Sequence, residues 1–136
     1  MIGRTHLEFR ADYAKSVSPE TEPSGEEVIA FLVNGIRQSG IAAAEPFAED
    51  WGWCSVLHVD GFRFLLGCGD YLEYEDGWLC FIDFRQGFRR FFKPNSARQA
   101  LRHATHAMHG AVQGNPRCRD RKWWSDTTGV GAVEEC

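Results

Sequence analysis

The spacing of hydrophobic residues predicts two amphipathic helices. Apolar residues recur every three or four positions after residue 24 and again after residue 96, which places them on one face of each helix. A capping box, Ser24 with Glu27 and Ser96 with Gln99, precedes each pattern. Gly40 supplies the left-handed residue that ends the first helix. The predicted buried stripes are Val28, Ile29, Leu32, Val33 and Ile36, and then Ala97, Leu101, Ala104, Met108 and Val112.

Alternation of apolar and polar residues predicts the strands. Residues 7–11 alternate near the N-terminus, and Asp60-Gly61 between two alternating runs is a strong signal for a two-residue hairpin turn. Residues 78–84 are apolar on both faces, which is typical of a central strand. Residues 71–74 fit a strand or a loop, and residues 85–94 fit one more short strand. The hairpin turn predicts the register Val59–Phe62, Leu57–Phe64, Ser55–Leu66 and Trp53–Cys68 on the face toward the helices.

This order of elements predicts an α+β fold. We expect a two-layer sandwich in which an antiparallel sheet of about four to five strands packs on two helices, in the order β-α-β-β-β-α. The 136 residues suffice for one domain. Residues 1–114 are predicted to form it, and residues 115–136, which lack a sustained period, are predicted to be a C-terminal loop or tail.

Charge divides the chain into two unlike parts. Residues 1–84 carry 5 basic and 15 acidic side chains, a net charge of −10, whereas residues 85–136 carry 10 basic and 4 acidic ones, a net charge of +6. Such asymmetry fits a bipolar surface that orients a charged partner. It fits equally well two halves that neutralise each other within the fold.

No motif in the sequence indicates a cofactor, a metal ion or a catalytic residue. The glycine-rich fingerprints of phosphate and dinucleotide sites are absent, and the cysteines contain no Cys-x-x-Cys pair. His103, His106 and His109 lie on a helix without any carboxylate, so we expect a solvated face there. A nucleophilic thiol beside His58 is not favoured, because nothing around Cys54, Cys68 or Cys80 indicates the electropositive setting that it needs.

The segment "EDWGWC", residues 49–54, combines two carboxylates with two tryptophans. Trp51 and Trp53 are expected on the same side of the chain, where one or the other covers the hydrophobic layer under a helix. The nearby carboxylates are expected to gather around Trp51 as an acidic rim, which resembles a protein interface with an aromatic anchor. The acidic rim consists of Glu49, Asp50, Asp70, Glu73, Glu75 and Asp76.

Two alternatives stay open at this point. The first is an enzyme or small-ligand domain with a cleft around Trp51, Trp53, His58 and Arg63. The second is nucleic acid binding, because basic and aromatic residues are interleaved in the second half of the chain. The residues involved would be Arg85, Arg89, Arg90, Lys93, Arg119 and Lys122.

The chain is expected to be cytoplasmic. It contains no apolar run of the length of a membrane helix, and its N-terminus lacks the apolar segment of a signal peptide. In that compartment the five cysteines are expected to be reduced and mostly buried. No membrane partner is expected.

The segment "SGIAAAEPFAEDWGWCSVLHVDGFRFLLGCG" resembles small bacterial α+β proteins that carry "EDWGW" at the start of a strand after the first helix. Small acidic proteins of this style include immunity proteins against toxins. The resemblance implies a cytoplasmic binding protein without catalysis, which docks a protein partner through the acidic rim and Trp51. An immunity or inhibitor role is the expected form of that function.

Overall fold

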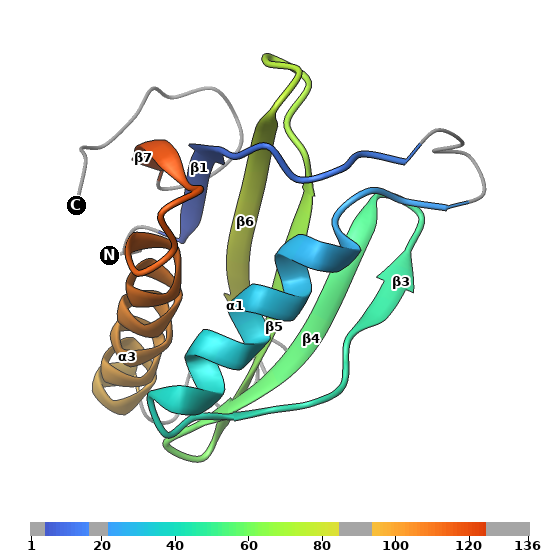
Figure 1. The fold of residues 1–136 in the computed structure, drawn as a ribbon. Coiled ribbons are helices and arrows are strands. Elements are labelled where there is room, and N and C mark those ends of the chain that lie inside the picture. The colour runs from blue at the N-terminus through green and yellow to red at the C-terminus, as the bar shows by residue number, and fades with distance from the viewer. Residues whose placement is uncertain (1–4, 17–21, 85–93, 125–136) are drawn as a thin grey trace.

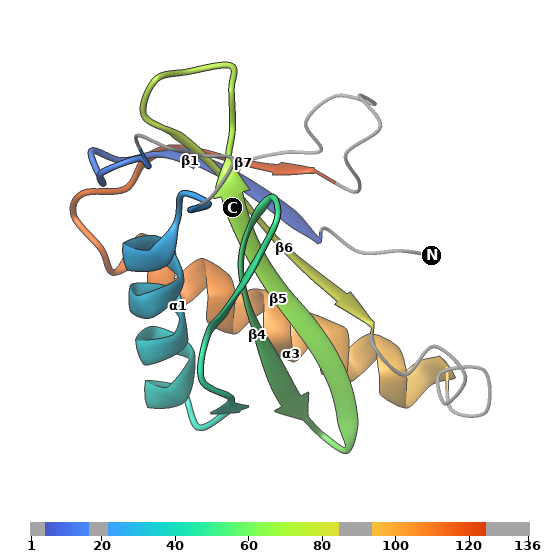
Figure 2. The ribbon, with the colours of Figure 1, turned by 90° about the vertical axis from the view of Figure 1, so that its right-hand side faces the viewer.

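The structure, a computed structural model, describes residues 5–16, 22–84 and 94–124. Within them, seven strands form one antiparallel sheet, and two helices lie side by side on one of its faces (Figures 1 and 2). The strand order is β2-β4-β5-β6-β1-β7, and β3 also pairs with β4. The elements are β1 (His6–Arg10), α1 (Glu26–Gln38), β2 (Ala42–Ala43), β3 (Phe47–Glu49), β4 (Gly52–Val59), β5 (Phe62–Asp70), β6 (Gly77–Phe84), α3 (Pro94–Gln113) and β7 (Arg119–Trp124).

The predicted sheet of about four to five strands in the order β-α-β-β-β-α is therefore wrong. The described residues form seven strands, five of them between α1 and α3 and one after α3. The short strands β2 and β3 lie within residues 42–50, for which the sequence pattern predicted no strand. The two or three residues in each are too few to show an alternating pattern.

Strand β7 is the other element that the sequence pattern did not predict. It lies within the segment expected to be a loop or tail, and it pairs with β1 at the edge of the sheet. Glu8 pairs with Lys122 and Arg10 with Arg119, so two residues of β7 lie opposite one residue of β1. This β-bulge, in which Asp120 has a φ of 55°, breaks the two-residue alternation that would have revealed the strand.

Both helices bury the stripes that were predicted for them. All ten predicted residues are buried against the sheet or between the helices. Gly40 has a φ of 95° and the buried Ile41 donates its backbone N–H to the carbonyl of Ile36, as expected for the end of α1. The two capping boxes are wrong. Ser24 accepts a hydrogen bond from the backbone N–H of Ser16 instead, and α3 begins before Ser96.

The hairpin of β4 and β5 has the predicted register from Val59–Phe62 to Trp53–Cys68. Alternate residues of the sheet thus face the helices and form the core, together with Leu7 and Phe9 of β1. Strand β6 lies between β5 and β1, which confirms that it is a central strand. Residues 71–76 form a loop, and the possible strand in residues 85–93 lies outside the described residues.

The two helices approach each other closely where α1 has a glycine. A Cβ atom on Gly35 would lie 2.6 Å from the Cβ of Ala111, closer than real side chains pack. Gly110, on the exposed side of α3, would have nothing within 4 Å of an added Cβ. The same substitution should therefore have opposite effects at the two positions.

We expect Gly35→Ala to lower the free energy of unfolding by about 1–3 kcal/mol, because the added methyl group overpacks the helix contact. The matched control Gly110→Ala should raise it by about 0.5–1 kcal/mol, because alanine restricts the unfolded chain more than glycine does. Urea unfolding followed by circular dichroism measures both. Equal stabilisation by the two substitutions would contradict the close helix contact.

Candidate functional site

The candidate site lies on the face of the sheet opposite the helices. Among the described residues no helix covers this open face (Figure 2). A single row of positions crosses it perpendicular to the strands, from β3 through β4, β5, β6 and β1 to β7. At the spacing of neighbouring strands, the part from β3 to β1 is about 19 Å long. The row consists of Phe47, Cys54, Gly67, Phe81, His6 and Trp124.

Aromatic rings occupy much of this row because Trp51 lies across it. Trp51 is in the two-residue turn between β3 and β4, and its ring centroid is 5.3 Å from that of Phe81. The ring fits there because residue 67 is glycine, where an added Cβ would lie 2.8 Å from the indole. Phe81 in turn stacks on His6 at 5.6 Å. We call Phe47, Trp51, Phe81 and His6 the aromatic row.

The expectation that Trp51 and Trp53 share one side of the chain is wrong. Trp53 faces the helices, and its indole N–H donates to the backbone carbonyl of Pro23 at 3.1 Å. Trp51 reaches the open face because the turn interrupts the alternation of the strand. It is 48% exposed, and Phe47 is 38% exposed, so the row presents large apolar side chains to solvent.

The acidic rim residues come from two loops at the same end of the sheet. Glu49 and Asp50 belong to the β3–β4 turn, and residues 70–76 to the end of β5 and the loop before β6. Asp70 pairs with Lys15, whereas Asp76 pairs with Arg10 and Arg119. Within the described part of the chain, no ion pair involves the remaining four, which we call the outer carboxylates: Glu49, Asp50, Glu73 and Glu75.

The residues of the alternative cleft are not brought together. His58 and Arg63 are neighbours on the open face, near the turn between β4 and β5. Trp53 lies on the opposite face, and it is five positions from His58 along β4, a distance of roughly 16 Å. Trp51 also lies at the far end of the strand. The geometry therefore gives no common cleft for these four side chains.

The cysteines of the described residues are buried and carry free thiols. Burial raises the pKa of the Cys80 thiol well above its usual range, and it raises the pKa of Cys118 to about 12. Both thiols are therefore protonated at neutral pH and are poor nucleophiles. On α3, His103 and His106 are exposed as expected, and no group of metal-ligating side chains occurs in the described ranges.

Of the basic residues considered for nucleic acid binding, only Arg119 and Lys122 are described. Arg119 forms an ion pair with Asp76, and Lys122 lies across from Glu8 on the neighbouring strand. Both cations therefore lie beside carboxylates, which weakens their attraction for phosphate groups. The other four, Arg85, Arg89, Arg90 and Lys93, lie outside the described residues.

The loop of residues 71–76 organises a charged cluster that the sequence pattern did not indicate. The Nε of Arg10 donates to Asp76 at 2.8 Å, and the guanidinium lies 4.5 Å above the ring of Tyr74. These hydrogen bonds and charges lower the pKa of Asp76. Burial is the largest cause that raises the pKa of Tyr71, and the nearby carboxylate of Glu8 adds to it. Only the strand order, which puts β1 beside β6 and β7, could have revealed this cluster.

Comparisons with protein families, curated proteins and solved structures find no match to this chain. The fold and the surface therefore carry the functional argument by themselves. They define an α+β protein with an antiparallel sheet, helices on one face and an aromatic row on the other. No helix in the described ranges is long and apolar enough to cross a membrane.

The lowered pKa of Asp76 predicts a pH dependence of stability. A carboxyl whose pKa falls on folding adds stability above its ordinary pKa, 3.8 here, and that stability is lost as the pH drops through the folded value. We expect Asp76→Asn to lower the free energy of unfolding by about 1 kcal/mol at pH 7, because the side chain remains partly exposed. The difference from the unmodified protein should shrink as the pH falls from about 4 toward 2.

Urea unfolding at a series of pH values measures this difference. The matched control is Asp50→Asn, whose carboxylate forms no ion pair with another described residue. It should change stability little at any pH. A constant difference for Asp76→Asn between pH 7 and pH 2 would refute the contribution of its charge.

Proposed function

We propose that this protein is a small cytoplasmic bacterial binding protein that docks a protein partner through its open face, without catalysis. The observation that carries the proposal is the exposed aromatic row, with the four outer carboxylates in the loops at the end of the sheet where Trp51 lies. We infer that an immunity or inhibitor role, in which binding itself blocks the partner, is the form of function that best suits such a surface.

The aromatic row has the properties of an interface anchor. Residues that dominate binding energy are enriched in tryptophan and lie in well-packed positions that lose water on docking. Trp51 is 48% exposed, yet its indole rests on Gly67 and Phe81, so little side-chain freedom remains to be lost. Adjacent apolar surface from Phe47 extends the patch to the edge of the sheet.

The outer carboxylates favour a partner with a basic surface. Their charges are not neutralised by ion pairs within the described residues, unlike those of Asp70 and Asp76. Complementary charge at the rim speeds association and rejects partners of the wrong sign. Because Glu49 and Asp50 directly precede Trp51 in the chain, one basic and apolar surface can contact both acidic and aromatic groups. This arrangement supports protein docking more than an enzyme, since the four alternative cleft residues are dispersed.

A capture experiment with matched variants tests the proposal. Tagged protein is incubated with lysate of the native cells at moderate salt, and captured proteins are quantified by mass spectrometry. The variant Glu49→Lys/Glu73→Lys reverses two outer carboxylates, and Gly67→Ala displaces the rings of Phe81 and Trp51 without changing charge. The control Glu26→Lys/Glu27→Lys makes the same charge change on α1, behind the sheet. Thermal unfolding verifies that each variant is folded.

We expect one stoichiometric protein partner that the unmodified protein and the control capture equally. Both test variants should reduce its capture by about tenfold or more, the loss expected for an interface anchor or its charged border. Equal capture by all four proteins would show that binding does not use the open face. Capture of nothing but nucleic acid that moderate salt removes would refute protein docking.

A further inference from the structure

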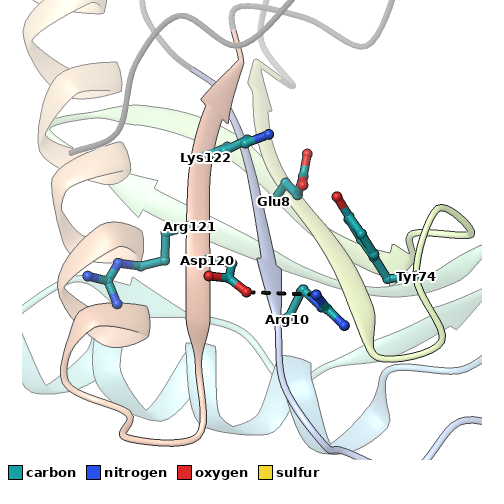
Figure 3. Close-up of a pocket in the computed structure, with 6 residues that line it drawn as sticks. All are labelled: Glu8, Arg10, Tyr74, Asp120, Arg121 and Lys122. Atoms are coloured by element: carbon teal, nitrogen blue, oxygen red, sulfur yellow. Dashed lines mark ion pairs between the residues drawn. The ribbon is translucent and has the colours of Figure 1, made fainter.

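A pocket of about 300 Å³ opens between β1, β7 and the loop of residues 71–76, and Glu8, Arg10 and Lys122 are among the side chains that line it (Figure 3). Arg10 forms ion pairs with Asp76 and Asp120, and the buried Glu8 also has an interaction partner. Because the charges of Arg10 and Glu8 are satisfied within the protein, the geometry of this pocket does not call for a charged ligand.

Two of the buried cysteines lie directly opposite each other on neighbouring strands. Cys68 of β5 and Cys80 of β6 are partners in the register of the sheet. Both side chains are 0% exposed and belong to the core that the sheet forms with the helices. Both thiols are free. The core therefore holds two thiols side by side on adjacent strands.

The hydrogen bonds of the sheet determine how closely this pair approaches. In an antiparallel sheet, pairs that exchange backbone hydrogen bonds alternate with pairs that do not, and pairs of the second kind are closer. The backbone N–H of Tyr71 donates to the carbonyl of Gly77, so this pair is of the first kind. Cys68 and Cys80 form the pair three positions further along the ladder and are therefore of the second kind. On the other side of β6, Ile82 donates to β1, and Cys80, two residues away, directs its backbone groups the same way.

Such a pair meets the distance requirement of a disulfide. The Cα atoms of pairs of this kind lie about 4.5 Å apart, and a disulfide bridges Cα atoms that are roughly 4.4–6.8 Å apart. The spacing is near the lower limit, so a bond here carries strain, and strained disulfides are more readily reduced. Burial is the largest cause that raises the pKa of the Cys80 thiol, and a hydrogen bond with Cys68 adds to it. The two sulfur atoms are therefore in contact before any bond forms.

The other two cysteines of the described residues lack this arrangement. Cys54 is equally buried, but its neighbours across the sheet are Gly67 and Phe47. Cys118 lies close enough to Cys80 to affect the pKa of that thiol, but it precedes β7 and has no strand partner. Among the described cysteines, direct opposition in the sheet thus distinguishes one pair.

We propose that Cys68 and Cys80 form a reversible disulfide when the protein meets a peroxide. One of the two, as its thiolate, attacks a peroxide oxygen and breaks the O–O bond, which gives a sulfenic acid and a hydroxide that takes up the proton of the thiol. The thiol opposite then attacks the oxidised sulfur, the S–O bond breaks, and a second water leaves. Two thiols lose two electrons and two protons in all, and one hydrogen peroxide is reduced to two waters.

Burial makes the first step of this reaction slow. A protonated thiol without access to solvent is a poor nucleophile, so peroxide reaches the pair only when the chain opens locally. The second step needs no further access, because the other thiol is already opposite. The bond links β5 and β6 next to the pair of Gly67 and Phe81, which lies on the open face. It forms in the isolated protein and does not depend on the docking proposal.

Peptide mapping after treatment with hydrogen peroxide tests this proposal. Trypsin releases residues 64–85 as one peptide that contains both cysteines, because no lysine or arginine lies between Arg63 and Arg85. Remaining thiols are alkylated in denaturant at mildly acidic pH, where few thiolates are present to exchange. We expect the peptide to lose two hydrogen atoms and to take up no alkylating reagent. Cleavage after Glu73 or Glu75 should leave its two fragments joined, and reduced glutathione should restore both thiols.

Cys54 is the internal reference, because it is equally buried and has no thiol opposite. The disulfide should form before half of Cys54 is oxidised. Cys54→Ala should retain the linked peptide, whereas Cys68→Ala should abolish it. Two alkylatable thiols in the peptide after half of Cys54 has reacted would overturn the proposal, as would a bond between Cys80 and Cys118. A bond that reduced glutathione does not open would overturn its reversibility. The mapping of the unmodified protein decides these outcomes even where a variant does not fold.

Discussion

The open face of this protein depends on two positions of β5 that lack side chains. On the face toward the helices, β5 contributes Leu66 and Cys68 to the core. On the other face Gly67 and Gly69 leave the backbone bare, and Trp51 lies directly over it. A side chain at Gly67 would collide with the rings of Phe81 and Trp51, and one at Gly69 would collide with the backbone carbonyl of Trp51. The contact of Trp51 with Phe81 therefore requires that both positions lack a side chain.

A second set of contacts joins the two ends of the described chain to its middle. Strand β1 lies between β6 and β7, so an early and a late segment meet beside the loop of residues 71–76. Asp76 accepts hydrogen bonds from Arg10 of β1 and Arg119 of β7. Ion pairs within the fold thus neutralise part of the charge asymmetry of the sequence. In one of them, the basic Arg119 of β7 pairs with the acidic Asp76 of the first half. The outer carboxylates take part in none of these ion pairs.

Local patterns predicted those elements whose residues repeat over at least two periods. The helix stripes and the register of β4 and β5 are confirmed, because burial on one face imposes a regular period on a long element. The predicted number and order of strands are wrong because the strands that were missed have no such period. β2 and β3 are too short, and the bulge at Asp120 interrupts β7. The predicted capping boxes are also wrong. Ser24 accepts a hydrogen bond from the backbone N–H of Ser16, and α3 begins before Ser96.

By itself, then, the sequence determined the two helices, the central hairpin and the residues of the core. Burial of one face of a helix or strand requires apolar residues at regular spacing, and that spacing is visible in the sequence. It also indicated an acidic rim near Trp51, although it put that tryptophan on the wrong face. The tertiary structure alone decided that Trp51 crosses Gly67 and that Glu8 and Lys122 share a pocket. Such contacts join residues far apart in the chain, and the pairing of distant strands leaves no local pattern from which to predict them.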